Sequence, residues 1–236
     1  MSGVQDLKFF LTEKERCPYL PEEQSSFLVV DPVRNVSPLE YSQLVEWGFR
    51  RSGSAVYRPH CKSCTECLPI RISVKNFVPK RRHKRILSKN SQISISKLKP
   101  FLSIEHFNLY SEYINSRHNS GAVDIPSINQ YRDFLVEARQ ETNFYEYRED
   151  GTLLAISVTD SLREGISAVY NFYDPTLTSR ALGIFMILSL IQETIKQNKR
   201  FLYLGYWIKG CKKMNYKSQF NPSEKFIDGK WIASEI

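Results

Sequence analysis

Long hydrophobic runs are missing from this chain. The longest largely apolar run, residues 181–191, has eleven residues, whereas a helix that crosses a bilayer needs about 20. No apolar signal core follows Met1, so we expect a cytoplasmic protein without a membrane partner. Internal repeats and low-complexity segments are also missing. With 42% apolar and 25% charged residues, the composition is that of a globular protein and excludes a disordered or collagen-like chain.

Acidic residues are missing between Cys67 and Ile104. The same stretch carries ten basic residues: Arg71, Lys75, Lys80, Arg81, Arg82, Lys84, Arg85, Lys89, Lys97 and Lys99. Positive charge without counter-charge suits phosphates, so we favour a nucleic-acid partner over a solvated basic face. No base-reading helix or RNA-recognition aromatic motif stands out. Contact with the backbone of a structured RNA is therefore a better interpretation than DNA binding.

Cysteines are few and unevenly placed. The chain has five, and three of them form the pattern Cys61-x2-Cys64-x2-Cys67. An odd count in a cytoplasmic chain favours metal binding over disulfides. Cys17 can supply a fourth thiolate, and four thiolates suit structural zinc or an iron–sulfur cluster. A reduced, packed thiol cluster without metal is the alternative, and the spacing leaves both open. Cys211 lies apart and is interpreted as a small packed residue.

Capping signals and hydrophobic periodicity predict the helices. Ser37 and Glu40 form a capping box with Pro38 at the first helical position, and Gly48 ends that helix. Further helices are expected at 104–117, 127–139 and 180–198. The last is apolar nearly all round in its first half, which is typical of a buried helix. Residues 115–126 are expected to form a loop.

Two-residue alternation predicts strands in the second half. Segments 144–148, 154–159 and 166–173 are separated by short turns, as in an antiparallel meander. A strand at 70–74 follows the cysteine-rich loop, and another at 201–207 follows the long helix.

Three strands, a long helix and a strand resemble the core order of a GNAT-type acyltransferase. In that fold the two strands beside the helix separate, and the acyl donor enters the gap. We therefore predict an α+β fold with two regions. Residues 101–236 form a GNAT-like core, a mixed, largely antiparallel sheet flanked by helices. Residues 1–100 form a smaller, basic, cysteine-containing region, which we expect to bind the nucleic acid.

A coenzyme A-dependent N-acetyltransferase is one alternative. Acetyltransferases of this fold carry Gln/Arg-x-x-Gly-x-Gly/Ala where the long helix begins, and its amides hold a pyrophosphate. This chain has Arg180-x-x-Gly183-x-Phe185, and we expect the large ring to obstruct that approach. A metal-containing, non-catalytic RNA-binding module is a second alternative. It leaves the motifs of the second half unexplained.

Two long motifs carry a family resemblance. Ser167-Ala-Val-Tyr-Asn-Phe-Tyr-Asp-Pro175 and Tyr203-Leu-Gly-Tyr-Trp-Ile-Lys-Gly-Cys-Lys-Lys-Met-Asn-Tyr-Lys217 resemble signatures of the aminoacyl-tRNA–protein transferases. The motifs around Cys17 and residues 57–67 are similar to the same family's cysteine motifs. The length and Cys67 resemble the bacterial branch, which transfers leucine from leucyl-tRNA to proteins that begin with Asp or Glu, marking them for N-end rule degradation. Longer eukaryotic relatives transfer arginine, so the choice of leucine rests on this resemblance.

The implied reaction is aminolysis of an activated ester, which requires no cofactor for catalysis. Positioning, oxyanion stabilisation and removal of the amine proton are sufficient. Tyr170 and Asp174 are the candidate catalytic residues. Tyr170 either donates a hydrogen bond to the oxyanion or the leaving group, or merely packs. Asp174 either holds or deprotonates the acceptor ammonium, or serves as a turn residue before Pro175.

Substrate-binding candidates lie in both halves. Tyr206 or Trp207 can stack on the terminal adenine of the tRNA. Phosphate contacts are expected from the basic side chains Arg81, Arg82, Arg180, Lys209, Lys212, Lys213 and Lys217, with a solvated surface or a local cap as the alternative. Arg58, Arg71 and Arg180 are unranked candidates for the acceptor's carboxylate, because arginine forks suit carboxylates. Any metal at Cys17, Cys61, Cys64 and Cys67 is expected to be structural or regulatory, because four thiolates leave no open position.

Overall fold

Eight strands from distant parts of the chain form the central sheet. The computed structural model describes residues 6–117 and 127–233. The strand order is β14 (Lys230–Ala233), β13 (Ser223–Ile227), β7 (Leu68–Ser73), β12 (Phe201–Trp207), β11 (Gly165–Tyr173), β10 (Thr152–Ser161), β9 (Thr142–Glu149) and β8 (Ser94–Leu98). Neighbours pair antiparallel except β11 and β12, which run parallel. The predicted α+β fold with a GNAT-like core is confirmed.

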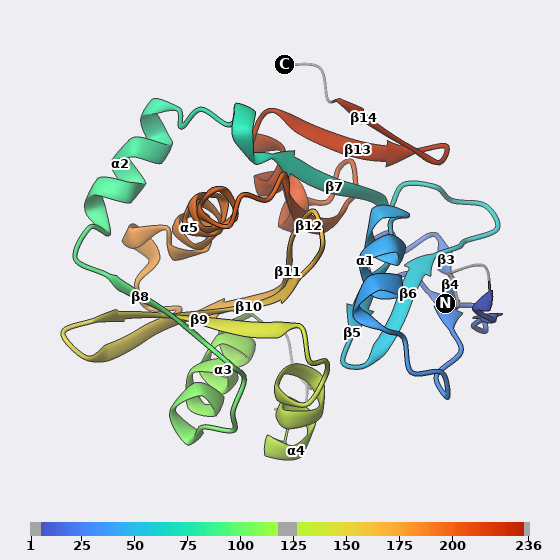
Figure 1. Ribbon diagram of the computed structural model, residues 1–236, viewed down its shortest axis with the longest axis horizontal. Helices are drawn as coiled ribbons and strands as arrows, with labels where there is room; N and C mark the ends of the chain where they lie inside the picture. Colours follow the sequence, from blue (N-terminus) through green and yellow to red (C-terminus); the bar gives the residue numbers. More distant parts are fainter. Residues whose placement is uncertain (1–5, 118–126, 234–236) are drawn as a thin grey trace.

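Helices cover both faces of this sheet (Figure 1). On one face lie α2 (Arg81–Lys89) and α5 (Leu182–Lys196), and on the other lie α3 (Ile104–Arg117) and α4 (Ile128–Tyr131). Nine residues of α5 are buried, as its nearly uniform apolar surface predicted. Phe185 of α5 packs edge-on against Tyr147 of β9, while Tyr110 of α3 packs against Phe172 of β11 on the other face.

Local signals predicted the helix starts well. In α1 (Pro38–Glu46) the Glu40 carboxylate accepts from the Ser37 amide at 2.8 Å, and Ser37 Oγ accepts from the Glu40 amide at 3.3 Å. The capping box of Ser127 is also confirmed, but α4 ends after one turn and continues as a π-helix, η3 (Arg132–Val136). Of the expected loop 115–126, residues 115–117 instead belong to α3, and residues 118–126 lie outside the described residues.

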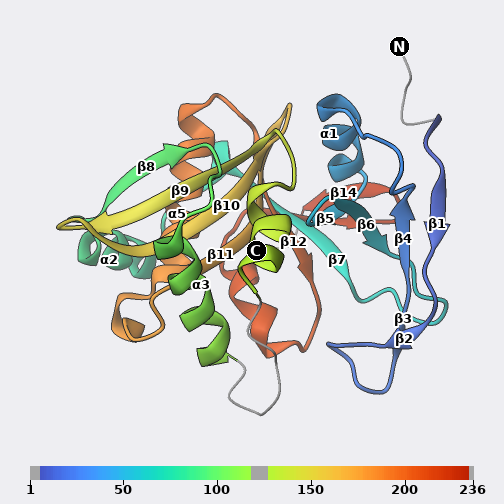
Figure 2. The same ribbon diagram turned by 90° about the horizontal axis from the view of Figure 1, so that it is seen from below.

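A second, smaller sheet lies beside the large one (Figure 2). Its strand order is β1 (Phe9–Leu11), β4 (Phe27–Val30), β6 (Ala55–Pro59) and β5 (Arg50–Ser52), and a two-stranded ribbon joins β2 (Glu15–Arg16) to β3 (Gln24–Ser25). The sequence analysis did not predict these short strands. The large sheet also includes β7 and β8, which precede residue 100 and pair with β12 and β9.

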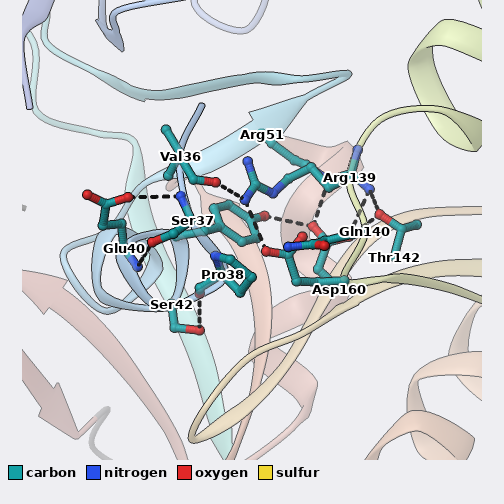
Figure 3. Close-up of polar contacts among 12 residues, drawn as sticks. Val36, Ser37, Pro38, Glu40, Ser42, Arg51, Arg139, Gln140, Thr142 and Asp160 are labelled. Carbon is teal, nitrogen blue, oxygen red and sulfur yellow. Dashed lines mark hydrogen bonds and ion pairs between the residues drawn. The ribbon is translucent and has the colours of Figure 1, made fainter. Parts of the chain in front are cut away.

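A buried ion pair connects the small sheet to the large one. The Arg51 guanidinium, on β5, donates to both carboxylate oxygens of Asp160, on β10, at 2.6 and 2.9 Å. Neither side chain is exposed to solvent. Thr142 donates to the same carboxylate at 2.8 Å, as does Tyr41 of α1 at 2.7 Å; Figure 3 shows Arg51, Thr142 and Asp160 converging. This network fixes the position of β5 relative to the large sheet.

Within the described residues, no helix is both long and apolar enough to cross a membrane.

Candidate active site

The parallel strands β11 and β12 separate after three paired positions. Gly165, Ile166 and Ser167 pair with residues 201–203, and no pairing continues beyond them. A cleft of about 660 Å³ opens where the strands separate. Its walls come from β11, the start of α5, α3, and the 3₁₀ segments η4 (Thr178–Arg180) and η5 (Lys212–Gln219). This is the gap in which the GNAT-like order predicted that the acyl donor enters.

A bulge in β12 separates the two strands. The register of β12 against β7 shifts between Tyr203 and Gly205, and Gly205 has a φ of +77°. Before the bulge, Tyr203 packs in the core of the small sheet and Leu204 packs in the core beneath α5. The bulge interrupts this alternation, because Trp207, three residues after Leu204, packs on the same side as Leu204.

The charged residues of the cleft all carry the same sign. Its described lining includes Arg50, Lys213 and Lys217 and no Asp or Glu. Lys213 is exposed, whereas Lys217 is buried at 6% exposure. The cleft is therefore built to receive anionic groups.

Arg50 reaches the cleft from the small sheet. Its Nη2 donates to the carbonyl oxygens of Ala168 and Val169 at 3.2 and 2.9 Å, two positions of β11 just beyond the last pair with β12. Its guanidinium occupies the space beside Gly205 that a Cβ would fill. Arg50 and Arg51 are adjacent on β5, so their side chains point to opposite sides. The sequence analysis missed Arg50, because no local pattern distinguishes it.

Lys217 is a buried amine in the wall of the cleft. Its Nζ donates a short hydrogen bond to the Tyr206 carbonyl. Burial, aided by the nearby positive charge of Arg50, lowers the pKa of Lys217 to about 7. A large fraction of Lys217 is therefore uncharged at neutral pH and can accept a proton.

The two candidate catalytic residues lie differently. Tyr170 lines the cleft, and its ring packs edge-on against Tyr110 and Phe134. Asp174 does not belong to the described lining; its carboxylate accepts from the Thr176 amide at 2.8 Å and from the Thr176 hydroxyl at 2.6 Å. That geometry is a turn at the end of β11. Catalytic roles for both residues stay predictions.

The three arginines predicted for the acceptor carboxylate lie outside the described lining of this cleft. Arg71 pairs with Glu224 at 2.6 Å. Arg180 makes two hydrogen bonds to Glu149, at 2.7 and 2.8 Å. Arg58 lines the separate pocket that contains the cysteines. Their predicted roles are not tested, but two of these charges already have a partner.

The aromatic candidates for adenine stacking are the last two residues of β12. Tyr206 is buried, and its hydroxyl donates to the Gly48 carbonyl at 2.9 Å. Trp207 is half-buried, with Lys225 Nζ 3.9 Å from its ring centroid. Lys209 is exposed just after the strand. A stacking role for either ring stays a prediction.

The basic segment folds into α2, which extends between the two rims of the cleft. Arg82 donates to Gln219 of η5 at 3.1 Å. At the other end of the helix, Lys89 donates to the Ser179 carbonyl of η4 at 2.9 Å. Arg81 and Arg82 are exposed, while His83 and Ile86 face the interior. The helix therefore presents its positive charge beside the cleft.

The four cysteines predicted to bind metal gather around one pocket of about 500 Å³. All are reduced and half-buried. Burial, together with the nearby Cys61, Cys17 and Cys64, raises the pKa of Cys67 to about 12. In the described part of the chain, no group of three or more His, Cys, Asp or Glu side chains is arranged to hold a metal ion. The donor types fit a thiolate metal site, and the thiols share a pocket.

A GNAT-like sheet whose strands separate beside a cation-lined cleft is the arrangement that the sequence analysis predicted for an acyltransferase. The model described as "Arginine-tRNA-protein transferase, N terminus" matches residues 15–85, and "Arginine-tRNA-protein transferase, C terminus" matches residues 105–227. The chain belongs to the arginine-tRNA-protein transferase family and is an aminoacyltransferase.

Relatives resemble the chain over nearly its whole length. It is 46% identical over 233 residues to an aspartate/glutamate leucyltransferase of Pseudomonas fluorescens, covering 99% of each chain. It is 46% identical to an aspartate/glutamate leucyltransferase of Alcanivorax borkumensis, covering 98% of this chain and 96% of the relative.

Among solved structures, a GCN5-related glucosamine N-acetyltransferase region of a fungal β-N-acetylglucosaminidase is 8% identical with a TM-score of 0.42, covering 67% of this chain and 20% of that chain.

Proposed function

We propose that the chain transfers leucine from leucyl-tRNA to the N-terminal α-amine of proteins that begin with Asp or Glu, in the cytoplasm. The product is a protein marked for N-end rule degradation. The observation that carries this proposal is a cleft with three cations and no carboxylate in its described lining, in a chain 46% identical to aspartate/glutamate leucyltransferases. Leucyl-tRNA and an acidic acceptor both bring negative charge to such a cleft.

An apolar wall of the cleft supports leucine as the transferred residue. This wall is formed by Val169, Leu182, Ile184, Ile187 and Leu204. Burying a leucine side chain contributes about 1.5–3 kcal/mol. An arginine side chain would instead place a guanidinium near Arg50 and Lys213, with no carboxylate in the described lining to pair with it. Burying an unpaired charge is unfavourable, so the geometry favours leucine over arginine.

Aminolysis requires the acceptor amine to lose a proton. The α-amine attacks the ester carbonyl, the C–O bond to the tRNA 3′-terminal ribose breaks, and the leaving oxygen takes up a proton. Lys217 has the position and the lowered pKa, about 7, to accept the amine proton. Tyr170 lies on the adjacent wall, where its hydroxyl can donate to the oxyanion or to the leaving oxygen. Asp174 is a weaker candidate, because its carboxylate is held by Thr176.

The basic surface beside the cleft suits the acceptor end of the tRNA. Exposed cations extend along α2 and η5, including Arg81, Arg82, Lys212 and Lys213. Lys209 extends this surface beyond β12, and Trp207 is the better placed ring for the terminal adenine, because Tyr206 is buried. These contacts are mainly electrostatic and do not depend on sequence.

Coenzyme A is disfavoured for a reason other than the one expected from the sequence. The ring of Phe185 is buried against Tyr147, so it does not obstruct the start of α5, and that expectation is wrong. Arg180 precedes α5, but its charge is paired with Glu149. The helix amides therefore have no unpaired arginine beside them to help hold a pyrophosphate.

We propose that Cys17, Cys61, Cys64 and Cys67 hold a structural zinc ion or iron–sulfur cluster. Such a group would connect the β2–β3 ribbon to the loop after β6, and it would supply stability. None of the four thiols belongs to the described lining of the cleft. Ester aminolysis has no redox step, so the chemistry of transfer does not require this group.

A transfer assay tests the function. The protein is incubated with labelled leucyl-tRNA or arginyl-tRNA and with peptides that begin with Asp, Glu, Arg or Ala and are otherwise identical. We expect label only from leucyl-tRNA and only on the Asp and Glu peptides. Transfer of arginine at an equal rate would overturn the choice of donor, and equal labelling of the Ala peptide would overturn the acidic acceptor. Tight binding of acetyl-coenzyme A in calorimetry would revive the acetyltransferase.

A further inference from the structure

The acceptor's acidic side chain needs a partner inside the cleft. Arg71 and Arg180 are paired with Glu224 and Glu149, and Arg58 faces the cysteine pocket. We propose that Arg50 binds the side-chain carboxylate of the N-terminal Asp or Glu and thereby determines the acceptor specificity. This inference rests on the proposed function and deepens it.

Arg50 has hydrogen-bonding capacity left over. A guanidinium has five N–H donors, and Nη2 of Arg50 donates to the Ala168 and Val169 carbonyls. Across residues 6–117 and 127–233, Nε and Nη1 have no hydrogen-bond partner, and no carboxylate lies within ion-pair distance of Arg50. Each of these two nitrogens can donate a charge-assisted hydrogen bond to a carboxylate oxygen.

The other two cations of the cleft are less suited to this task. Lys213 is exposed, so water screens its charge and its side chain keeps its rotamer freedom. Lys217 already donates to the Tyr206 carbonyl, and it is partly uncharged at neutral pH. Arg50 is the permanent, half-buried charge with a planar fork. Arginine at such a site distinguishes a carboxylate from an amide of the same shape.

The fold holds this guanidinium at the point where β11 and β12 separate. Ala168 follows Ser167, the last residue of β11 that pairs with β12. Two features keep Arg50 there: the adjacent Arg51 fixes β5 through Asp160, and Gly205 leaves the space that the guanidinium occupies. An acceptor whose side chain reaches Arg50 places its α-amine in the same cleft as Tyr170 and Lys217.

Neutral acceptors of the same size are expected to be poor substrates. An Asn or Gln side chain can accept only on one side, and its NH₂ group would face the donors of Arg50. The guanidinium would then lose water without gaining a counter-charge. Selectivity for Asp over Asn, and for Glu over Gln, is therefore the property that Arg50 should control.

The test measures kcat/KM for leucine transfer to peptides that begin with Asp, Asn, Glu or Gln and are otherwise identical. Wild type is compared with Arg50→Gln, Arg50→Lys and the matched control Arg58→Gln. Truncating one partner of a close charge pair costs about 2–5 kcal/mol, so the Asp/Asn ratio in Arg50→Gln should fall about 30-fold or more. The Asp/Asn ratio of Arg50→Lys should lie between those of wild type and Arg50→Gln, because lysine keeps the positive charge and lacks the planar guanidinium. Arg58→Gln should retain the wild-type ratio.

The outcomes separate this inference from the proposed function. If the wild-type protein does not transfer leucine to the Asp peptide, the proposed function fails, whatever the variants do. If wild type is selective and Arg50→Gln or Arg50→Lys is folded with an unchanged Asp/Asn ratio, Arg50 is not the carboxylate partner. A fall of the Asp/Asn ratio in Arg58→Gln, with the wild-type ratio kept in the Arg50 variants, would show that the acceptor's carboxylate binds in the cysteine pocket. Arg50→Lys keeps the test decisive if Arg50→Gln does not fold.

Discussion

The guanidinium of Arg50 lies beside the backbone of Gly205, where a Cβ would overlap its Nη1, Cζ and Nε atoms. The two residues are far apart in sequence, and they come from different sheets. Glycine is required here for two reasons: the backbone has a φ of +77°, and the space of its side chain is occupied. A residue of the second family signature thus determines where an arginine of the small sheet can lie.

The first prediction is that Gly205→Ala displaces Arg50. Backbone strain alone should lower the free energy of unfolding by about 1–3 kcal/mol, and the Asp/Asn acceptor ratio should fall as it does in Arg50→Gln. Urea unfolding and the peptide assay measure the two effects. The control is Gly151→Ala, which has a similar φ of +81° but open space around its Cβ. It should lose stability and keep the ratio; a wild-type ratio in Gly205→Ala would contradict the predicted displacement.

A second prediction concerns the ion pair between Arg51 and Asp160. Both side chains are fully buried, so Arg51→Met leaves an unpaired carboxylate and should lower the free energy of unfolding by about 3–5 kcal/mol. The double variant Arg51→Met/Asp160→Leu removes both charges and should recover much of that loss. Denaturant titration of the three proteins, with the two-state fit checked by two probes, measures this. A double variant less stable than the single one would show that Thr142 and Tyr41 need the carboxylate more than Arg51 does.

Local patterns predicted some of the elements, though not α2, β8, β13 or β14, and long-range contacts determined the site. The capping box of Ser37 and the meander of β9, β10 and β11 depend on neighbouring residues, and both were predicted from the sequence. The small sheet was missed because its strands have three to five residues, too few for a periodic signal.

The charges of the candidate site show the same limit. Arg71 belongs to a stretch without acidic residues, yet Glu224 neutralises it from 153 positions away. Arg180 meets Glu149 after two strands have intervened. The guanidinium of Arg50 is held in the cleft by hydrogen bonds to the carbonyls of Ala168 and Val169, which lie 118 and 119 positions later in the chain. A count of charges along the sequence finds the basic region, but only tertiary pairing determines which cations stay available.

A third prediction tests the basic surface of α2. Arg81, Arg82 and Arg85 are exposed, so replacing all three with Ala should weaken tRNA binding and reduce the slope of log Kd against log salt by roughly 2 to 3. Binding titrations at several salt concentrations measure the slope. The control removes two exposed charges at the closed end of β11 and β12, in Arg163→Ala/Arg200→Ala. An unchanged slope in the α2 variant would place the tRNA elsewhere.

A fourth prediction follows from the lowered pKa of Lys217. The folded-state pKa is about 7, and the unfolded-state value is about 10.4, so between these values the unfolded state binds more protons. The free energy of unfolding should therefore rise with pH in that window, by up to about 1.4 kcal/mol per pH unit. Because other groups titrate there too, the measurement is the difference between wild type and Lys217→Met, which lacks this contribution. A difference that is constant from pH 7 to 9 would contradict the lowered pKa.

The last prediction separates structure from chemistry at the cysteines. Cys64 lines the pocket shared with Cys17, Cys61 and Cys67 and lies outside the described lining of the cleft. If these thiolates hold a structural metal, Cys64→Ser should lower metal content and melting temperature together, because metal binding stabilises only the folded state. The folded fraction should keep a near-normal single-turnover rate on leucyl-tRNA.

Metal analysis, melting and single-turnover transfer on the same preparation test this prediction, with Cys211→Ser as the control for metal content. A Cys64→Ser protein with unchanged metal content would show that Cys64 is not a ligand. A variant that is folded, metal-free and inactive would place the cysteine pocket in the mechanism. We do not expect that result, because an ion enclosed by four thiolates has no open position for an ester carbonyl. The cations that can bind the substrates also lie in the other cleft, between β11 and β12.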